Sequence, residues 1–146
     1  MFRQPEHHRS RYAGDGITYG VYAGEDGNVT VGSVTSTGGG TAVYATNGGS
    51  VEITGSVLAE GDYAYAVQCF DGSDIFVSDN VSVTGNSACG MYVESFGENR
   101  SDARVGKNLT VSGEGSRAGL ACGNAWLFVF NNITVAGDQS TGISAT

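Results

Sequence analysis

Apolar and polar residues alternate in short runs along most of the chain, and turn-forming residues separate the runs. One six-residue pattern recurs: Asn or Ser, an apolar residue, any residue, an apolar or small residue, any residue, then Gly. Its five copies begin 23, 24, 28 and 24 residues apart, at Ser33, Ser56, Asn80, Asn108 and Asn132. Alternation over such short runs predicts half-buried β-strands, and their regular recurrence predicts a repeat architecture.

Two further alternating runs complete each repeat. One starts with a small residue, as in 42–45, 66–69, 90–93, 119–122 and 142–145, and 20–23 precedes the first copy. The other consists of the pairs Val29/Val31, Val51/Ile53, Ile75/Val77, Ala103/Val105 and Leu127/Val129. Each repeat then holds three short strands joined by turns, and parallel strands of successive repeats stack about 4.8 Å apart. We expect an all-β solenoid of about five coils, with 23–28 residues per coil.

This repeat style resembles the right-handed parallel β-helix of the pectate-lyase-like superfamily, including the solenoid passengers of bacterial surface proteins. The resemblance covers residues 15–146 and rests on architecture, not on an active-site signature. It implies a right-handed β-helix in a longer surface or fibre protein, with an extracellular or cell-surface location. We expect residues 1–14 to form a flexible basic tail and residues 15–146 to form one β-helix domain.

Composition supports the same class. The 146 residues include 24 Gly without a three-residue period and a single Pro, which excludes collagen. No run of 18 apolar residues is present, so no membrane span is expected, and the N-terminal residues have no apolar signal-peptide core. The net charge of −8 disfavours nucleic-acid binding, since an acidic surface repels phosphate.

Alternation also sorts side chains into inward and outward columns. The inward columns predicted for the first strand of each coil are Val21, Val43, Val67, Met91, Leu120, Ile143, and then Ala23, Ala45, Cys69, Val93, Cys122, Ala145. The predicted outward columns are Gly20, Ala42, Ala66, Gly90, Gly119, Gly142, and then Tyr22, Tyr44, Gln68, Tyr92, Ala121, Ser144. Cys69 and Cys122 are therefore expected in the core, and Cys89 near a corner. Asn80, Asn108 and Asn132 are expected to form an amide ladder at another corner.

Candidate chemistry is sparse. A polysaccharide lyase or hydrolase needs clustered carboxylates, a Ca²⁺ site or a basic residue on adjacent coils. The acidic residues are instead expected in turns, at Glu25, Asp26, Asp71, Asp74, Glu98 and Asp102. We therefore expect no catalytic residue, no metal site and no cofactor. The preferred function is a noncatalytic structural, adhesin-like segment, and an enzyme remains the less favoured alternative.

A binding module is the other alternative, because Tyr22, Tyr44, Gln68 and Tyr92 share an outward column beside small residues. Aromatic rings stack on sugars and anchor protein contacts, so a glycan or a surface protein is the expected partner. A separate expectation concerns the C-terminal end of the solenoid, where strand edges and apolar residues are left uncovered. We expect self-association there, involving Leu127, Phe128 and Ile133, or a parent protein that continues with more coils.

Overall fold

The computed structural model describes residues 18–146, and these form sixteen β-strands and no helix. The tail predicted for residues 1–14 lies outside the described residues. Sheet A contains β1 (Tyr19–Ala23), β4 (Thr41–Ala45), β7 (Tyr65–Phe70), β10 (Cys89–Ser95), β13 (Arg117–Gly123) and β16 (Thr141–Ala145). Sheet B contains β2 (Asn28–Val31), β5 (Ser50–Ile53), β8 (Asp74–Val77), β11 (Ser101–Val105) and β14 (Ala125–Val129). Sheet C contains β3 (Val34–Ser36), β6 (Val57–Glu60), β9 (Val81–Thr84), β12 (Leu109–Ser112) and β15 (Ile133–Ala136).

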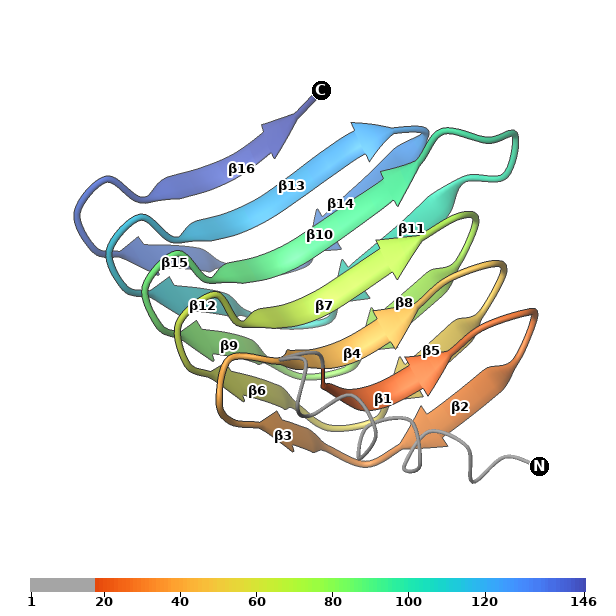
Figure 1. Ribbon diagram of the computed structural model, residues 1–146, viewed down its shortest axis with the longest axis horizontal. Coiled ribbons are helices and arrows are strands. Elements are labelled where there is room, and N and C mark those ends of the chain that lie inside the picture. The colour runs from red at the N-terminus through yellow and green to blue at the C-terminus, as the bar shows by residue number, and fades with distance from the viewer. Residues whose placement is uncertain (1–17) are drawn as a thin grey trace.

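The three sheets are the walls of a parallel β-solenoid of about five coils, as the repeats predict. In Figure 1 the strands of sheet A rise in order from β1 to β16 on the near side, and sheets B and C close the coil behind them. Every strand pair within the sheets is parallel. The winding visible in Figure 1 is consistent with a right-handed helix. Within residues 18–146 no helix is long and apolar enough to cross a membrane.

The core is a stack of apolar side chains from all three sheets, and most of its large members are the β-branched residues Val and Ile. Val43, Val67 and Met91 are fully buried in sheet A, and Ile53 and Leu109 face them from sheets B and C. Branched side chains favour strands and pack well on a pleated surface. The inward columns predicted for the first four coils are therefore confirmed.

The inward columns predicted for the fifth coil are wrong by one residue. Strand β13 pairs with β10 at a constant offset of 28 residues, so Met91 lies beside Gly119 and Tyr92 beside Leu120. Leu120 and Cys122 are consequently on the outward side and partly exposed. Gly119 takes the core position because its neighbour fills the space: a Cβ on Gly119 would lie 2.7 Å from Cδ1 of Leu127.

The small-residue column predicted to face outward is also wrong. Ala42, Ala66 and Ala118 are fully buried, and a Cβ on Gly90 would lie 2.8 Å from Cδ1 of Leu109. These residues lie at the corner where sheet C meets sheet A. Two successive residues face the interior there, and only Gly or Ala fits the narrow space.

The asparagine ladder forms at the corner before sheet C. The Asn108 side-chain amide donates a hydrogen bond of 3.1 Å to Oδ1 of Asn80, as predicted. At the next step Asn131, rather than Asn132, donates its side-chain amide to Oδ1 of Asn108, at 2.9 Å. Asn132 contributes its backbone N–H to the same oxygen, at 3.2 Å.

Candidate functional site: the aromatic face of sheet A

The outer surface of sheet A carries two adjacent columns that are rich in tyrosine. In the first, Tyr19, Thr41, Tyr65 and Cys89 are register partners on β1, β4, β7 and β10. In the second, the four predicted site residues Tyr22, Tyr44, Gln68 and Tyr92 are register partners on the same strands. The structure therefore brings the predicted residues together, but continues their column with Leu120 in place of Ala121.

Six rings make one connected lattice across these strands, called here the aromatic face: Tyr19, Tyr22, Tyr44, Tyr65, Phe70 and Tyr92. Tyr19 stacks on Tyr44 with ring centroids 4.8 Å apart, and Tyr65 stacks on Tyr92 at 6.2 Å. Phe70 joins the two groups through edge contacts with Tyr44 at 5.6 Å and Tyr92 at 5.0 Å. Such pairs stabilise neighbouring strands and hold each ring in place.

Sequence reasoning missed Tyr19, Tyr65 and Phe70 as members of this face. Tyr19 and Tyr65 are in the register column of Cys89, which sequence analysis placed near a corner and not on a binding face. Phe70 follows Cys69, which the sequence places in the core, and strict alternation would have marked Phe70 as outward. The alternation of inward and outward residues therefore contained the information needed to place Phe70 on this face.

The hydroxyl groups of Tyr44, Tyr65 and Tyr92 have a raised pKa and stay protonated over a wide pH range. Burial raises the pKa of Tyr44, with a smaller contribution from Tyr19, and burial also raises the pKa of Tyr65. The hydrogen bond that the Tyr92 hydroxyl donates to Oε1 of Glu94 raises the pKa of Tyr92. At neutral pH each hydroxyl is both a donor and an acceptor.

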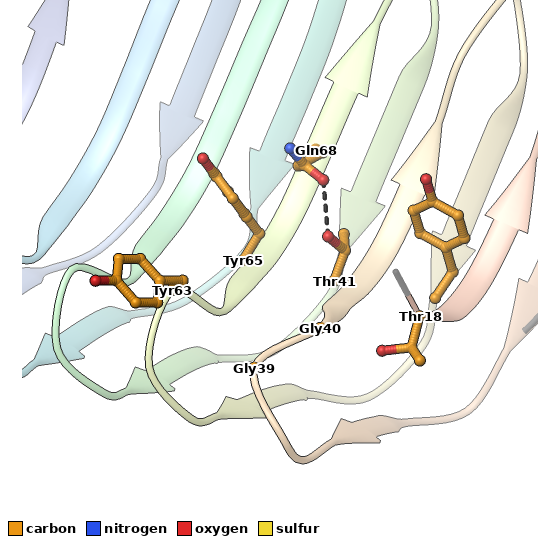
Figure 2. Close-up of a pocket in the computed structure, with 8 residues that line it drawn as sticks. Thr18, Gly39, Gly40, Thr41, Tyr63, Tyr65 and Gln68 are labelled. Atoms are coloured by element: carbon orange, nitrogen blue, oxygen red, sulfur yellow. Dashed lines mark hydrogen bonds between the residues drawn. The ribbon is translucent and has the colours of Figure 1, made fainter. Parts of the chain in front are cut away.

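An open hollow of about 340 Å³ interrupts the lattice at its N-terminal side, and Figure 2 shows the residues that line it. Two positions in the tyrosine columns are polar instead of aromatic, namely Thr41 and Gln68. These two side chains form the floor, where the Thr41 hydroxyl donates a 2.7 Å hydrogen bond to Oε1 of Gln68. The remaining lining residues are Thr18, Tyr19, Gly39, Gly40, Tyr63 and Tyr65.

Gly39 and Gly40 line one side of the hollow, and close packing around them leaves no room for a side chain. A Cβ on Gly40 would collide with Oγ1 of Thr18, and a Cβ on Gly39, whose φ is +87°, would lie 2.6 Å from the carbonyl oxygen of Asp62. No larger residue fits at these positions without moving its neighbours. Because Gly39 and Gly40 have no side chains, the space beside Tyr65 remains open.

Sheet B places two carboxylates side by side, contrary to the expectation that they lie in turns. Asp74 on β8 and Asp102 on β11 are register partners, and burial together with the charge of Asp102 raises the pKa of Asp74. Arg100 makes a bidentate hydrogen-bonded pair with Asp102 at 2.7 and 3.0 Å. The Arg100 guanidinium also lies over the Trp126 ring, 3.7 Å from its centroid.

The residues expected to mediate association lie at the C-terminal edge strands β14 and β15. Phe128 and Ile133 are 39% and 42% exposed, whereas Leu127 is partly buried against the core. Phe128 lies between Trp126 and Phe130, with centroid separations of 5.5 and 6.3 Å. Sequence analysis did not include these two neighbours, which are 48% and 65% exposed.

Within residues 18–146 no group of three or more His, Cys, Asp or Glu side chains is arranged to hold a metal ion. A scan against protein-family models found no match, and neither a search of curated proteins nor a search of solved structures found one.

Proposed function

We propose that this chain is a noncatalytic, adhesin-like β-helix module of a bacterial surface or fibre protein, and that its aromatic face binds a glycan or a protein surface. The observation that carries the proposal is the connected lattice of six rings on the outer side of β1, β4, β7 and β10. The rings are only partly buried, so their exposed portions remain available to a ligand.

The scaffold supports this role by holding the rings in fixed positions. Strands β4 and β7 are each paired on both sides, so the backbone beneath the face is restrained by two ladders of hydrogen bonds. A ligand that docks on such a face meets side chains that lose little conformational freedom on binding. We place the chain with right-handed β-helices of the pectate-lyase-like kind as part of the same proposal, on its repeat style alone.

Binding to arrays of glycans and of surface proteins tests the proposal. We expect the parent chain to bind at least one ligand, and Tyr44→Ala and Tyr92→Ala each to weaken that binding at least tenfold. Phe76→Ala, which removes an outward ring from sheet B, is the matched control and should bind as the parent does. Circular dichroism checks that all variants are folded. A parent that binds nothing, or variants that bind as well as the parent, would remove the proposal.

A further inference from the structure

We infer that the hollow floored by Thr41 and Gln68 is a subsite for one neutral pyranose unit of a glycan. This inference rests on the proposed function, because it names the ligand class and the position where that ligand would be held on the aromatic face.

The walls of the hollow are aromatic and are supported from behind. Tyr19 and Tyr65 flank Thr41 in one column, two coils apart, or roughly 9.6 Å at the spacing of parallel strands. Tyr19 rests on Tyr22 and Tyr44, and Tyr65 rests on Tyr92. Rings held in this way present their faces to the apolar C–H side of a sugar ring.

The floor supplies the polar groups that a sugar requires. Thr41 is 7% exposed, and its hydroxyl is oriented by the hydrogen bond to Oε1 of Gln68. Among the described residues no group accepts a hydrogen bond from Nε2 of Gln68, so both of its hydrogens are available to a ligand. Together with the hydroxyls of Tyr63 and Tyr65, the floor offers both donors and acceptors, which matches sugar hydroxyls that donate and accept. A proline-rich peptide would use only the donors, because it presents mainly carbonyl acceptors.

Charge favours a neutral ligand over an acidic one. None of the eight lining residues that belong to the described part of the chain is charged. Among the described residues, every Lys and Arg lies between Arg100 and Arg117, whereas acidic residues such as Glu60 and Asp62 precede the tyrosines at the rim. An acidic sugar would meet a negative potential there, with no cation among the lining residues of the 18–146 segment to offset it.

Tyr63 at the rim gives independent support. It is 70% exposed and adopts a left-handed backbone conformation with φ of +63°, which is uncommon for a bulky residue. The backbone N–H groups of Tyr63, Ser87 and Gly115 each bond to the next coil at the same turn position. The turn therefore accepts Ser or Gly, and the fold does not require a tyrosine. The left-handed conformation recurs at Ser87 (φ +54°) and Gly115 (φ +67°), so it belongs to the turn, and the support for a site comes from the bulky exposed ring at Tyr63.

Two substitutions change the hollow and leave every residue of the buried core unchanged. Tyr63→Gly takes away the rim ring and relieves the left-handed conformation, so its melting temperature should equal or exceed that of the parent. Gln68→Tyr completes the tyrosine column and fills the hollow. Ser87→Gly is the matched control for the first, because it lies at the same turn position one coil on. Ser82→Tyr is the control for the second, since it adds the same ring to β9 on sheet C.

The parent and the four variants are titrated with five ligands, and calorimetry or NMR measures the binding. The ligands are cellotetraose, mannotetraose, xylotetraose, tetragalacturonate and a proline-rich peptide. We expect at least one neutral tetrasaccharide to bind, with Tyr63→Gly and Gln68→Tyr each weakening it at least tenfold and both controls leaving it unchanged. Binding of tetragalacturonate or the peptide alone overturns the inference, as does absence of binding. The inference is also overturned if Tyr63→Gly and Gln68→Tyr both bind the tetrasaccharide as tightly as the parent does. If Tyr92→Ala still weakens binding of that tetrasaccharide in this case, the proposed function survives.

Discussion

Gly85 shows how single residues permit the stacking of these coils. Its φ is +152°, and a Cβ there would collide with the carbonyl oxygen of Gly61 in the preceding coil. Gly113 and Gly137 stand in the same relation to the glycine one coil before them. The backbones of successive coils therefore touch at this corner, and any side chain would separate them.

The first prediction is that Gly85→Ala destabilises the solenoid by about 2 kcal/mol or more, because it combines backbone strain with a collision between coils. Gly32→Ala is the matched control, since a Cβ on Gly32 meets no atom within 4 Å, and its effect should stay within about 0.5 kcal/mol. Urea denaturation of both variants measures the difference. Equal stability of the two would show that the coils do not touch at Gly85.

The second prediction concerns the three thiols. Cys69 and Cys89 are buried; burial raises the pKa of Cys69 and raises that of Cys89 to about 11. Cys122 is partly exposed on the outer side of β13. At pH 8 we expect Ellman's reagent to label one thiol rapidly and the other two only after unfolding. The rapid reaction should disappear in Cys122→Ser, and its persistence there would contradict the register of β13.

At the scale of elements, the sequence predicted the three strands of each coil and most of their facing, because alternation and repeat spacing report directly on strands. Alternation predicted the wrong facing at two places, the corner before sheet A and strand β13. Ala42 and Gly90 face inward because the chain bends sharply at the corner before sheet A, and alternation contains no information about such a bend. The register of β13 was missed because Gly119 resembles the small residue that opens other copies, whereas the Leu127 side chain fills its place in the core.

The third prediction follows from the pairing of β8 with β11. Asp74 has a raised pKa when folded, so the folded chain binds its proton more tightly than the unfolded chain. Ionisation of Asp74 therefore lowers stability as the pH rises through that pKa. We expect Asp74→Asn to melt at a higher temperature than the parent at pH 7. The advantage should vanish below the ordinary carboxyl value of 3.8, where Asp74 is protonated in both states.

Thermal melts at pH 7 and pH 3 check this, with Asp138→Asn as a control for the loss of one negative charge. An Asp74→Asn variant that gains nothing at pH 7, or that gains equally at both pH values, would show that the folded chain does not disfavour the charged form of Asp74.

At the scale of the whole molecule, charge and exposed apolar groups are unevenly distributed along the solenoid axis. Among the described residues, all cations lie between Arg100 and Arg117. Residues 18–146 contain seven exposed large apolar residues, and all but Tyr63 lie at or beyond Phe96, including Trp126, Phe128 and Phe130. Contiguous exposed rings of this kind mark interaction surfaces. The sequence located Phe128 here through its column, but the cluster with Trp126 and Phe130 required the structure.

The fourth prediction is that the 146-residue chain self-associates in a concentration-dependent way through this cluster. Replacing Trp126, Phe128 and Phe130 together by Ser should reduce the association without unfolding the protein, because all three rings lie outside the core. Tyr63→Ser removes a single exposed ring elsewhere and should have no effect. Light scattering over a range of concentrations measures the mass, and a parent that stays monomeric at the highest concentration would contradict the prediction.

The central claim is that a ligand binds to the outer side of sheet A. It is tested most directly by mapping amide shifts in ¹H–¹⁵N NMR spectra while the parent chain is titrated with its strongest array ligand. We predict that the shifts concentrate on β4, β7 and β10, around Thr41, Gln68 and Tyr92, and that β14 stays silent. Shifts centred on sheet B or sheet C, or spread evenly over the chain, would contradict the account.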